Sequence, residues 1–505
     1  MMSETRYKLH PVAAVITFVK GLKDLIFPLV IFLILGNTGG EDGGLFRFIP
    51  YVLGGLALLL YLISGIIKWW KYEYWFEDGE LRIEYGLIVK KKRYIPFERI
   101  QSLDYTESIF HRPFKLVKVK VETAGGGVSG EAEAELTAIT LAAADQIKQE
   151  MIAAKKKRVK VVDEVEGDSL EEGVDAIQPI ELESETGSQT STTRLLHKMK
   201  SKDLLLLAAT SGGIGIIFSG AAVVLSQFSE FIPYEAIYNE ALELFRFGAM
   251  FVALLVFAVV LISFLVSVVL TYLQNYGYTV TLDDKELIIQ RGLLEKKRTT
   301  IPMHRIQGIQ LVENPFRQLF GYATIVLDSA GGSVLEKSET VKLVPLLKRT
   351  EAVTLLTDLF PEWDWDPEFT RAPKRTRKFY YRINLLLIAI IGAVLSYFFY
   401  PYGLLFFLLI PVSVAFDIWN HKASGIAIRD TYLAMQYRFF SRKTVWLAKK
   451  RIQAVTLSQS YFEKRADAAS IHATIKSGAL GSQHSLKAME RDDMQRVMNW
   501  YLPNT

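Results

Sequence analysis

Six long apolar stretches divide the chain, and each is close to the length of a membrane-spanning helix. They lie at about 13–36, 48–70, 204–227, 248–273, 383–400 and 402–420. A helix needs about 20 apolar residues to cross a hydrocarbon core of roughly 30 Å. The pattern therefore predicts a membrane protein with six spans, of which the first is the least regular.

Three charged residues, Lys20, Lys23 and Asp24, interrupt the first stretch. Ionisable side chains within a span are functional candidates, and Lys20 and Asp24 stand one helical turn apart, where they can pair. The alternative is a helix that begins near the cytoplasmic leaflet, with its lysine side chains reaching to the surface. We favour this second interpretation because all three charges lie in the cytoplasmic half of the segment.

Lysine and arginine are distributed asymmetrically around the apolar stretches. The connectors at 37–46, 228–245 and 400–402 contain neither residue, whereas the flanking segments are rich in both. Positively charged residues next to spans are retained in the cytoplasm. We therefore expect three helical hairpins in a multi-pass protein of the cell membrane, with both termini cytoplasmic.

The segments that follow the hairpins contain a motif that occurs three times. Residues 94–101 match residues 300–307, which lie 206 residues later, and residues 446–453 a further 146 residues on. All three contain Arg-Ile-Gln. The same offsets, without gaps, align Gly86 with Gly292, Glu107 with Glu313, and Phe110 with both Phe316 and Phe462. A register held this long indicates an internal repeat. The third copy diverges most, with Arg438 in place of the glycine and Ala448 in place of the proline.

Each copy shows the sequence pattern of short antiparallel strands. Val117–Thr123 alternates apolar and polar residues, as a half-buried strand does, and Asp283-Asp284-Lys285 separates two such runs as a turn. An amphipathic helix is expected to close each copy, at 136–153, 344–359 and 485–502. Each copy is thus predicted to be a small sheet covered by one C-terminal helix.

These features together resemble a known family. The Ile-Pro-x-x-Arg-Ile-Gln core, Asn314–Gly321 and Ser329–Gly332 are similar to the second class of bacterial pleckstrin-homology (PH) domains. Three such domains, each after a hairpin, resemble the YdbT-type multi-pass membrane proteins. The resemblance implies a PH-like, partly open barrel with a capping helix, and it implies no established activity. The expected fold class is an α+β membrane protein in which three transmembrane helical hairpins alternate with three PH-like domains, each a small β-barrel or sandwich.

The expected domain boundaries follow from these assignments. They are 1–70 for the N-terminal segment and hairpin 1, 71–154 for PH-like domain 1, 155–193 for a linker, 194–273 for hairpin 2, 274–360 for PH-like domain 2, 361–382 for a basic and aromatic linker, 383–420 for hairpin 3 and 421–505 for PH-like domain 3.

The linker at 155–193 differs in composition from its surroundings. Lys155–Arg158 is followed by residues 161–193, which carry ten Asp or Glu and no Lys or Arg. High charge and few aromatic residues predict a disordered, solvated tether. The alternative is that the acidic run transiently neutralises a basic surface nearby. Without these ten carboxylates the formal charge is +15 rather than +5, which favours contact with an anionic membrane over nucleic acid.

Two sets of polar residues recur at equivalent positions. The basic clusters on an early strand of each copy are candidates for contact with anionic lipid headgroups, as basic residues of lipid-binding PH domains are; the alternative is a solvated strand face. The clusters comprise Lys90, Lys91, Lys92, Arg93, Lys296, Lys297, Arg298, Arg442 and Lys443. The Arg-Ile-Gln positions are expected to be structural rather than ligand-binding. They are Arg99, Gln101, Arg305, Gln307, Arg451 and Gln453.

No catalytic constellation is recognisable in the sequence. Cysteine is absent, which excludes disulfides and thiolate metal sites, and the seven histidines form no close pair at metal-ligand spacing. We expect no catalytic residues, no metal site and no cofactor. The predicted function is a non-enzymatic membrane scaffold whose cytoplasmic PH-like domains bind partner proteins, one another or anionic lipid headgroups. A smaller membrane protein with one PH-like domain is a candidate partner. The alternatives are a component of a transporter or channel, or a factor for lipid handling or envelope protection.

Overall fold

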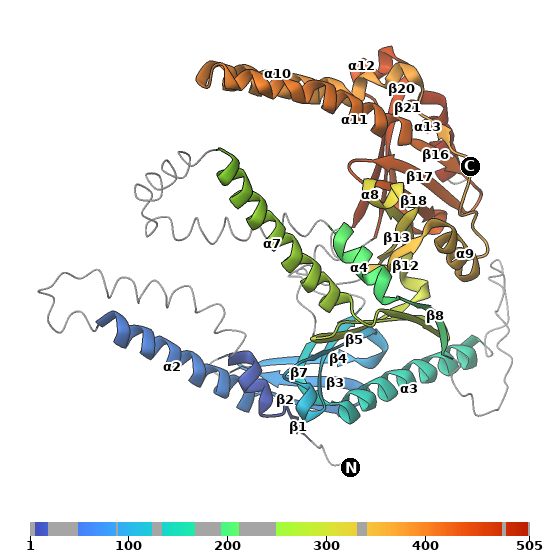
Figure 1. The fold of residues 1–505 in the computed structure, drawn as a ribbon. Coiled ribbons are helices and arrows are strands. Elements are labelled where there is room, and N and C mark those ends of the chain that lie inside the picture. Colours follow the sequence, from blue (N-terminus) through green and yellow to red (C-terminus); the bar gives the residue numbers. More distant parts are fainter. Residues whose placement is uncertain are drawn as a thin grey trace, which may run out of the picture. The chain divides into compact units, whose positions relative to one another are not determined.

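The computed structural model describes residues 6–18, 49–86, 89–123, 134–166, 193–211, 249–330, 341–476 and 481–502. The chain divides into two compact units (Figure 1). The first comprises residues 1–192 and 294–302, and the second comprises residues 193–293 and 303–505.

The first repeat forms two antiparallel sheets and a long helix in the first unit. Its elements are β1 (Tyr7–Lys8), α2 (Ile49–Trp70), β2 (Glu73–Glu77), β3 (Glu80–Tyr85), β4 (Lys91–Pro96), β5 (Ile100–Ser108), β6 (Leu116–Thr123), β7 (Ala134–Thr140) and α3 (Leu141–Glu166). Strands β1 to β4 follow chain order in one sheet, whereas the other has the order β7-β6-β5 and then β11 (Glu295–Pro302). The last strand comes from the second repeat.

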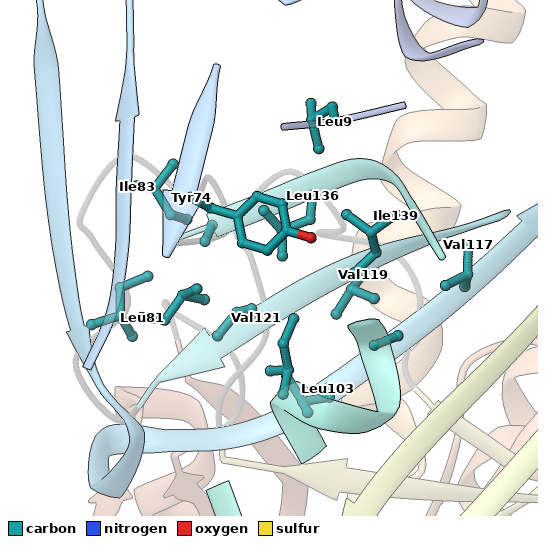
Figure 2. Packing of buried hydrophobic residues seen from close by; sticks show 14 of the residues in the cluster. Leu9, Tyr74, Leu81, Ile83, Leu103, Val117, Val119, Val121, Leu136 and Ile139 are labelled. Carbon is teal, nitrogen blue, oxygen red and sulfur yellow. The ribbon is translucent and has the colours of Figure 1, made fainter. Parts of the chain in front are cut away.

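Apolar residues on alternate strand positions form the core of the first unit. Leu81 and Ile83 of β3 face Val119 and Val121 of β6 across the space between the sheets (Figure 2). The helix α3 closes this core with Ala144, Ile147 and Met151, all buried. This arrangement follows from the period-two pattern of the strands and the 3.6-residue period of the helix.

The second unit contains the rest of the second repeat and all of the third. Elements of the second repeat are β8 (Arg194–Lys198), α4 (Ser201–Thr210), α7 (Ala249–Asn275), β9 (Thr279–Asp283), β10 (Glu286–Arg291), β12 (Ile306–Glu313), α8 (Pro315–Leu319), β13 (Tyr322–Ser329), β14 (Val341–Lys348) and α9 (Arg349–Leu359). Elements of the third are β15 (Thr370–Arg371), α10 (Lys378–Phe398), α11 (Leu409–Ala423), β16 (Gly425–Ile428), β17 (Tyr432–Arg438), β18 (Arg442–Ala448), β19 (Ile452–Ser458), α12 (Tyr461–Arg465), β20 (Ala468–Ile475), β21 (Ser482–Glu490) and α13 (Arg491–Tyr501).

Strands of the two repeats are combined in the sheets of the second unit. One sheet of seven strands has the order β14-β13-β12-β18-β17-β16-β15, and another of three strands has the order β19-β20-β21. Strands β8, β9 and β10 are neighbours in the order β10-β9-β8. The second repeat therefore pairs with the third in the same way as the first repeat pairs with β11.

Each repeat also uses a strand that precedes its predicted hairpin, which the sequence analysis missed. β1 pairs with β2, β8 with β9, and β15 with β16. Tyr7 lies opposite Tyr74, and Arg371 lies opposite Gly425. The chain segments before and after each predicted hairpin are thus neighbours in one sheet.

The C-terminal helices are shorter than the sequence pattern suggested, because the last strand of each repeat was assigned to them. Residues 136–140, 344–348 and 485–490 are strand, and the helices begin at Leu141, Arg349 and Arg491. These strands are buried mainly on one face, and such short alternating runs are ambiguous between strand and helix.

Helix α3 corrects the start of the predicted linker. It continues to Glu166, so residues 155–166 are helical rather than part of an irregular tether. The segment contains neither glycine nor proline, and lysine, arginine and glutamate are good helix formers. Residues 167–192 lie outside the described part of the chain.

Four described helices are long and apolar enough to cross a membrane. They are Val52–Trp70, Phe257–Asn275, Lys374–Phe398 and Tyr402–Ala423. They match the second, fourth, fifth and sixth predicted spans. Helices α10 and α11 lie side by side (orange in Figure 1). The first and third predicted spans lie mostly outside the described residues, as do Lys20, Lys23 and Asp24.

Candidate functional site: inter-repeat seams and membrane-proximal turns

The repeated Ile-Pro-x-x-Arg-Ile-Gln motif forms the corner between the two sheets of a repeat. In the first repeat β4 ends at Pro96, a single 3-10 turn covers Phe97–Arg99, and β5 begins at Ile100. Proline suits the end of a strand because it has no N–H to donate to a neighbouring strand. The third repeat makes the same corner with Ala448 in that position.

The Arg-Ile-Gln side chains differ in burial among the repeats. Arg305 is buried and its Nε donates to the carbonyl of Ala330 over 2.8 Å, while Gln307 donates to the carbonyl of Arg305. Arg99, Arg451 and Gln453 are exposed, and Arg451 donates to the carbonyl of His304 over 2.8 Å. The hydrogen bonds of Arg305, Gln307 and Arg451 are thus to main-chain carbonyls, and the structural role of the motif stays a prediction.

The first seam is the pairing of β5 with β11, and it contains the second basic cluster. Lys296 lies opposite Glu107, Lys297 opposite Thr106 and Arg298 opposite Tyr105. The Arg298 guanidinium lies 5.9 Å from the centre of the Tyr105 ring. A basic residue opposite an acidic one stabilises an antiparallel strand pair.

The second seam is the pairing of β12 with β18, and it contains the third basic cluster. Arg442 lies opposite Glu313, and its Nε and second guanidinium nitrogen donate to the two carboxylate oxygens over 2.7 and 2.8 Å. Glu313 is 1% exposed. Such two-point pairing is the strongest form of a charged hydrogen bond between side chains. Lys443 lies opposite Val312.

The two seams have the same register. Shifted by the repeat offsets, the pair Glu107–Lys296 becomes Glu313–Arg442. The sequence alignment had placed the two glutamates together without showing what they contact. Their partners lie 189 residues away from Glu107 and 129 residues away from Glu313, and no local pattern connects such distant positions. The sequence analysis therefore did not identify these glutamates as contact residues of the seams.

The first basic cluster has a different environment, because it lies on β4 at the edge of its sheet. Lys90, Lys91 and Lys92 are exposed. Glu84 of β3 lies 3.6 Å from the Lys90 ammonium and 3.9 Å from that of Lys92. Arg93 is partly buried, with its guanidinium 5.7 Å from the centre of the Tyr85 ring. Of the three clusters, this one is the most accessible to a headgroup.

A buried polar network lies beside the second seam. Gln310 of β12 donates to Asp328 of β13 over 2.7 Å, and His484 of β21 lies 3.4 Å from the same carboxylate. The Tyr437 hydroxyl lies 3.0 Å from Nδ1 of His484. Burial raises the pKa of Tyr437, and the nearby Asp328 carboxylate raises it further. The network joins strands of the second and third repeats and keeps the tyrosine protonated.

Exposed aromatic residues occupy the same turn in all three repeats. Phe110, Phe316 and Phe462, which the sequence aligns, are 52%, 64% and 55% exposed. Leu319 and Phe320 add to the second turn, and Tyr461 adds to the third. A recurring cluster of exposed apolar side chains marks a contact surface rather than a chance exposure. We call these segments the membrane-proximal turns.

Each membrane-proximal turn contacts a residue in or close to a predicted span. Asn314 and Arg317 of the second turn donate to the carbonyl and hydroxyl oxygens of Thr210, at the end of α4. The Arg382 guanidinium of α10 lies 5.0 Å from the ring of Phe462. In the first turn, the Phe114 ring lies 5.7 Å from that of His10.

Arg317 fixes the second turn most extensively. It also donates to the Thr324 hydroxyl over 2.7 Å and to the Pro345 carbonyl over 3.3 Å. Burial lowers the pKa of Arg317 to about 10, so the guanidinium stays charged at neutral pH. The turn is thereby held between the end of α4 and the sheet.

Two apolar helices of the third repeat share a polar contact. Asn384 of α10 donates to both carboxylate oxygens of Asp417 in α11, over 3.0 and 2.9 Å. Near the turn that joins the two helices the packing is also close, because a side chain at Gly403 would meet the backbone of Leu395 at 2.3 Å. Interhelical hydrogen bonds of this kind join spans. Within the described residues, no group of three or more His, Asp or Glu is placed to hold a metal ion.

Pairs of small sheets closed by a C-terminal helix, each next to apolar helices of membrane-spanning length, define a class of protein: a membrane protein built from PH-like repeats. The family model of the bacterial PH domain matches residues 30–155, 223–360 and 384–505. The chain belongs to this family of bacterial PH-domain proteins.

One curated relative is similar to the chain over its full length. The UPF0699 transmembrane protein YdbT of Bacillus subtilis (strain 168) is 32% identical over 507 residues, covering 99% of each chain. No solved structure matches the chain. The chain is therefore similar, from end to end, to a transmembrane protein.

Proposed function

We propose that this protein is a non-enzymatic membrane scaffold in which three hairpins hold three PH domains at the cytoplasmic leaflet, joined to one another through shared sheets. The observation that supports this most directly is the repeated seam: β5 with β11, and β12 with β18. Continuous hydrogen bonding between repeats, with buried Glu313 at the second seam, favours a fixed framework over three independent domains.

The hairpin arrangement is part of this proposal. A span that crosses once would leave its two ends on opposite sides of the membrane. The strands before and after each predicted hairpin are instead paired, as Lys198 with Thr279 and Thr370 with Ile426. Paired strands lie about 5 Å apart, so the intervening chain must return to the side from which it left. This supports an even number of crossings in each repeat.

The surface that the framework offers to the membrane combines aromatic and basic residues. Aromatic side chains prefer the headgroup region, and each basic residue near an anionic leaflet contributes about 1 kcal/mol. Phe110, Phe316 and Phe462 supply the first property and Lys90–Lys92 the second. Anionic headgroups are accordingly the proposed lipid contact, and the seams are the proposed sites of contact between PH domains.

Charge reversal at the second seam tests the scaffold. Glu313→Arg places two guanidinium groups opposite each other, and the double variant Glu313→Arg with Arg442→Glu restores opposite charges. Membranes of cells that express each form would be extracted with a mild detergent, and the protein would be purified. The proteins and lipids that co-purify with it would then be identified by mass spectrometry. The parent and the double variant should retain the same set, and the single variant should lose it.

Membrane insertion of all three forms, measured by carbonate extraction, is the matched control. If the single variant inserts normally and still retains the full set of proteins and lipids, the shared sheet is not what organises them and the scaffold proposal is wrong.

A further inference from the structure

Two strand edges differ from their equivalents elsewhere in the chain. β4 corresponds by repeat to β11 and β18, and β19 corresponds to β5 and β12. The equivalents all pair across a seam, whereas β4 and β19 are the outer strands of their sheets among the described residues. Other outer strands, such as β7, β14 and β21, are outer in all three repeats. Among the described strands, the first repeat therefore has no seam at β4, and the third repeat has no seam at β19.

Burial shows that these two edges are uncovered within the described chain. Every residue of β12 except Val312 is buried, but in β19 only Ile452 is buried and four of its seven residues are exposed. Likewise Thr444–Leu447 of β18 are buried, while β4 has one buried residue, Ile95. An outer strand presents unpaired N–H and C=O groups that another strand can use.

The repeat fixes the register in which a β19-type strand would pair with β4. Both seams obey one rule, in which Thr106 faces Lys297 and Val312 faces Lys443. Lys91 is the equivalent of Lys297 in the first repeat, and Ser458 is the equivalent of Val312 in the third. The same rule therefore places Lys91 opposite Ser458. It also puts Arg93 opposite Thr456 and Tyr94 opposite Val455.

The side chains that this register brings together are compatible. Residues 452–458 carry no charge, so they add no like charge opposite Lys91 or Arg93, and Glu84 lies within 4 Å of both Lys90 and Lys92 and offsets one of their two positive charges. Lys90 would face Gln459, whose side-chain oxygen can accept its hydrogen bond. Tyr94 opposite Val455 is an aromatic and β-branched pair, a favourable combination across antiparallel strands, as is Trp446 opposite Ile309 in the second seam.

We propose that β4 of one copy pairs with β19 of a second copy, so that chains assemble head to tail by adding a further seam. The chain itself argues for this occupant, because its described part has one outer strand of each complementary type, β4 and β19. Such an interface uses two different surfaces and leaves a new β4 and a new β19 at the ends, so it builds rings or rows in the membrane plane. This inference rests on the scaffold proposed above and extends it from one chain to an array.

The absence of native cysteine makes disulfide trapping a direct test. Two differently tagged full-length chains, one with Lys91→Cys and one with Ser458→Cys, would be co-expressed and their membranes oxidised. A disulfide between the two tags is expected. Lys91→Cys with Gln453→Cys is the out-of-register control, because residue 453 lies at the far end of β19 and should remain unlinked.

A matched control separates failure of this inference from failure of the scaffold. Lys297→Cys with Thr106→Cys in one chain occupies the equivalent pair of the first seam and should form an intrachain disulfide. If that control links and the two tagged chains do not, the second copy is the wrong occupant. If the control does not link either, the shared sheet is wrong and both proposals fail. A link between 91 and 458 only when both cysteines are in one chain would also overturn pairing between copies.

A charge variant tests whether the link reports the proposed register. Thr456→Lys places a positive charge opposite Arg93 of the second copy, and the yield of the 91–458 link should fall about two- to fivefold, the size expected for one like-charge cross-strand pair. Arg93→Glu in the second copy should restore it. An unchanged yield in both variants would show that the chains meet by chance collision rather than by strand pairing.

Discussion

Glu313 and Arg442 form the charged contact that the second seam buries most deeply. The carboxylate is 1% exposed and accepts two hydrogen bonds from the guanidinium. Removing one member of a buried ion pair leaves the other without compensation, which costs about 3–5 kcal/mol. The equivalent Glu107 is only partly buried opposite Lys296, and exposed pairs contribute about 0–1 kcal/mol.

Glu313→Ala should therefore destabilise the protein strongly and Glu107→Ala weakly. The expected cost is about 3 kcal/mol for the first, at the low end because Arg442 keeps some contact with solvent, and below about 1 kcal/mol for the second. Thermal unfolding of the full chain in detergent, followed by intrinsic fluorescence, would measure both. Similar losses of stability in the two variants would contradict the difference in burial.

Two glycines show which single residues could be interpreted from the sequence. Gly86 and Gly292 could be predicted as turn residues, and both have a positive φ, of 110° and 106°. A side chain at Gly86 would meet the carbonyl oxygen of Val89 at 2.1 Å. In the third repeat the equivalent residue is Arg438, which is the last residue of β17. Its guanidinium lies 3.8 Å from the centre of the Trp419 ring. A residue that the local backbone conformation requires, such as a turn glycine, can be predicted from the sequence. The pairing of residues far apart in the chain, such as Glu313 with Arg442, cannot.

Among the elements, the membrane-proximal turns carry the clearest expectation. Phe316 is exposed on α8, while hydrogen bonds from Asn314 and Arg317 to Thr210 fix the turn that carries it. An exposed phenylalanine next to the end of a span should reach the headgroup region.

A spin label at Phe316→Cys should therefore be more accessible to oxygen than to a polar nickel reagent in nanodiscs, measured by electron paramagnetic resonance. Labels at Phe110→Cys and Phe462→Cys should behave alike, because the turn recurs. Thr357→Cys, exposed on α9, is the control expected to favour the nickel reagent. A label at 316 with the accessibility of the control would show that the turn faces water.

Strands and apolar helices could be predicted from periodicity more completely than their ends. The runs after the predicted hairpins were recognised as β structure, and four apolar helices match predicted spans. The last strand of each repeat merged with the helix behind it, since β14 runs directly into α9 without a turn residue between Lys348 and Arg349. β1 and β15 have two residues each, too few to show any period.

For the whole molecule, the paired strands before and after each hairpin predict the membrane topology. Fusions of a cytoplasmic reporter at residues 160, 365 and 505 should be active, and fusions at 41 and 238 should report the outside. The Lys/Arg asymmetry and the pairing of β15 with β16 give the same expectation. An outside signal at 365 would contradict the arrangement of all three hairpins.

The pairing of strands from different repeats could not be predicted from the sequence. The pattern places β11 within the expected domain 274–360 and gives no sign of a partner in the first repeat. In the structure β11 pairs with β5, and residues 294–302 are grouped with the first unit. Which strand an edge selects depends on surfaces assembled from distant parts of the chain, and three similar repeats offer several candidates for each edge.

The seams also impose an order on biosynthesis. Glu295, the partner of Ser108, is synthesised about 190 residues after it. At about 5–20 residues per second, β5 waits roughly 10–40 s for β11, while two further predicted spans enter the membrane. During that interval the nascent chain exposes an edge that could pair with the wrong strand, including the same edge on a neighbouring ribosome's product. Chains that stall or are cut after the first repeat keep this edge permanently, and they should be the forms that aggregate and are cleared by proteases.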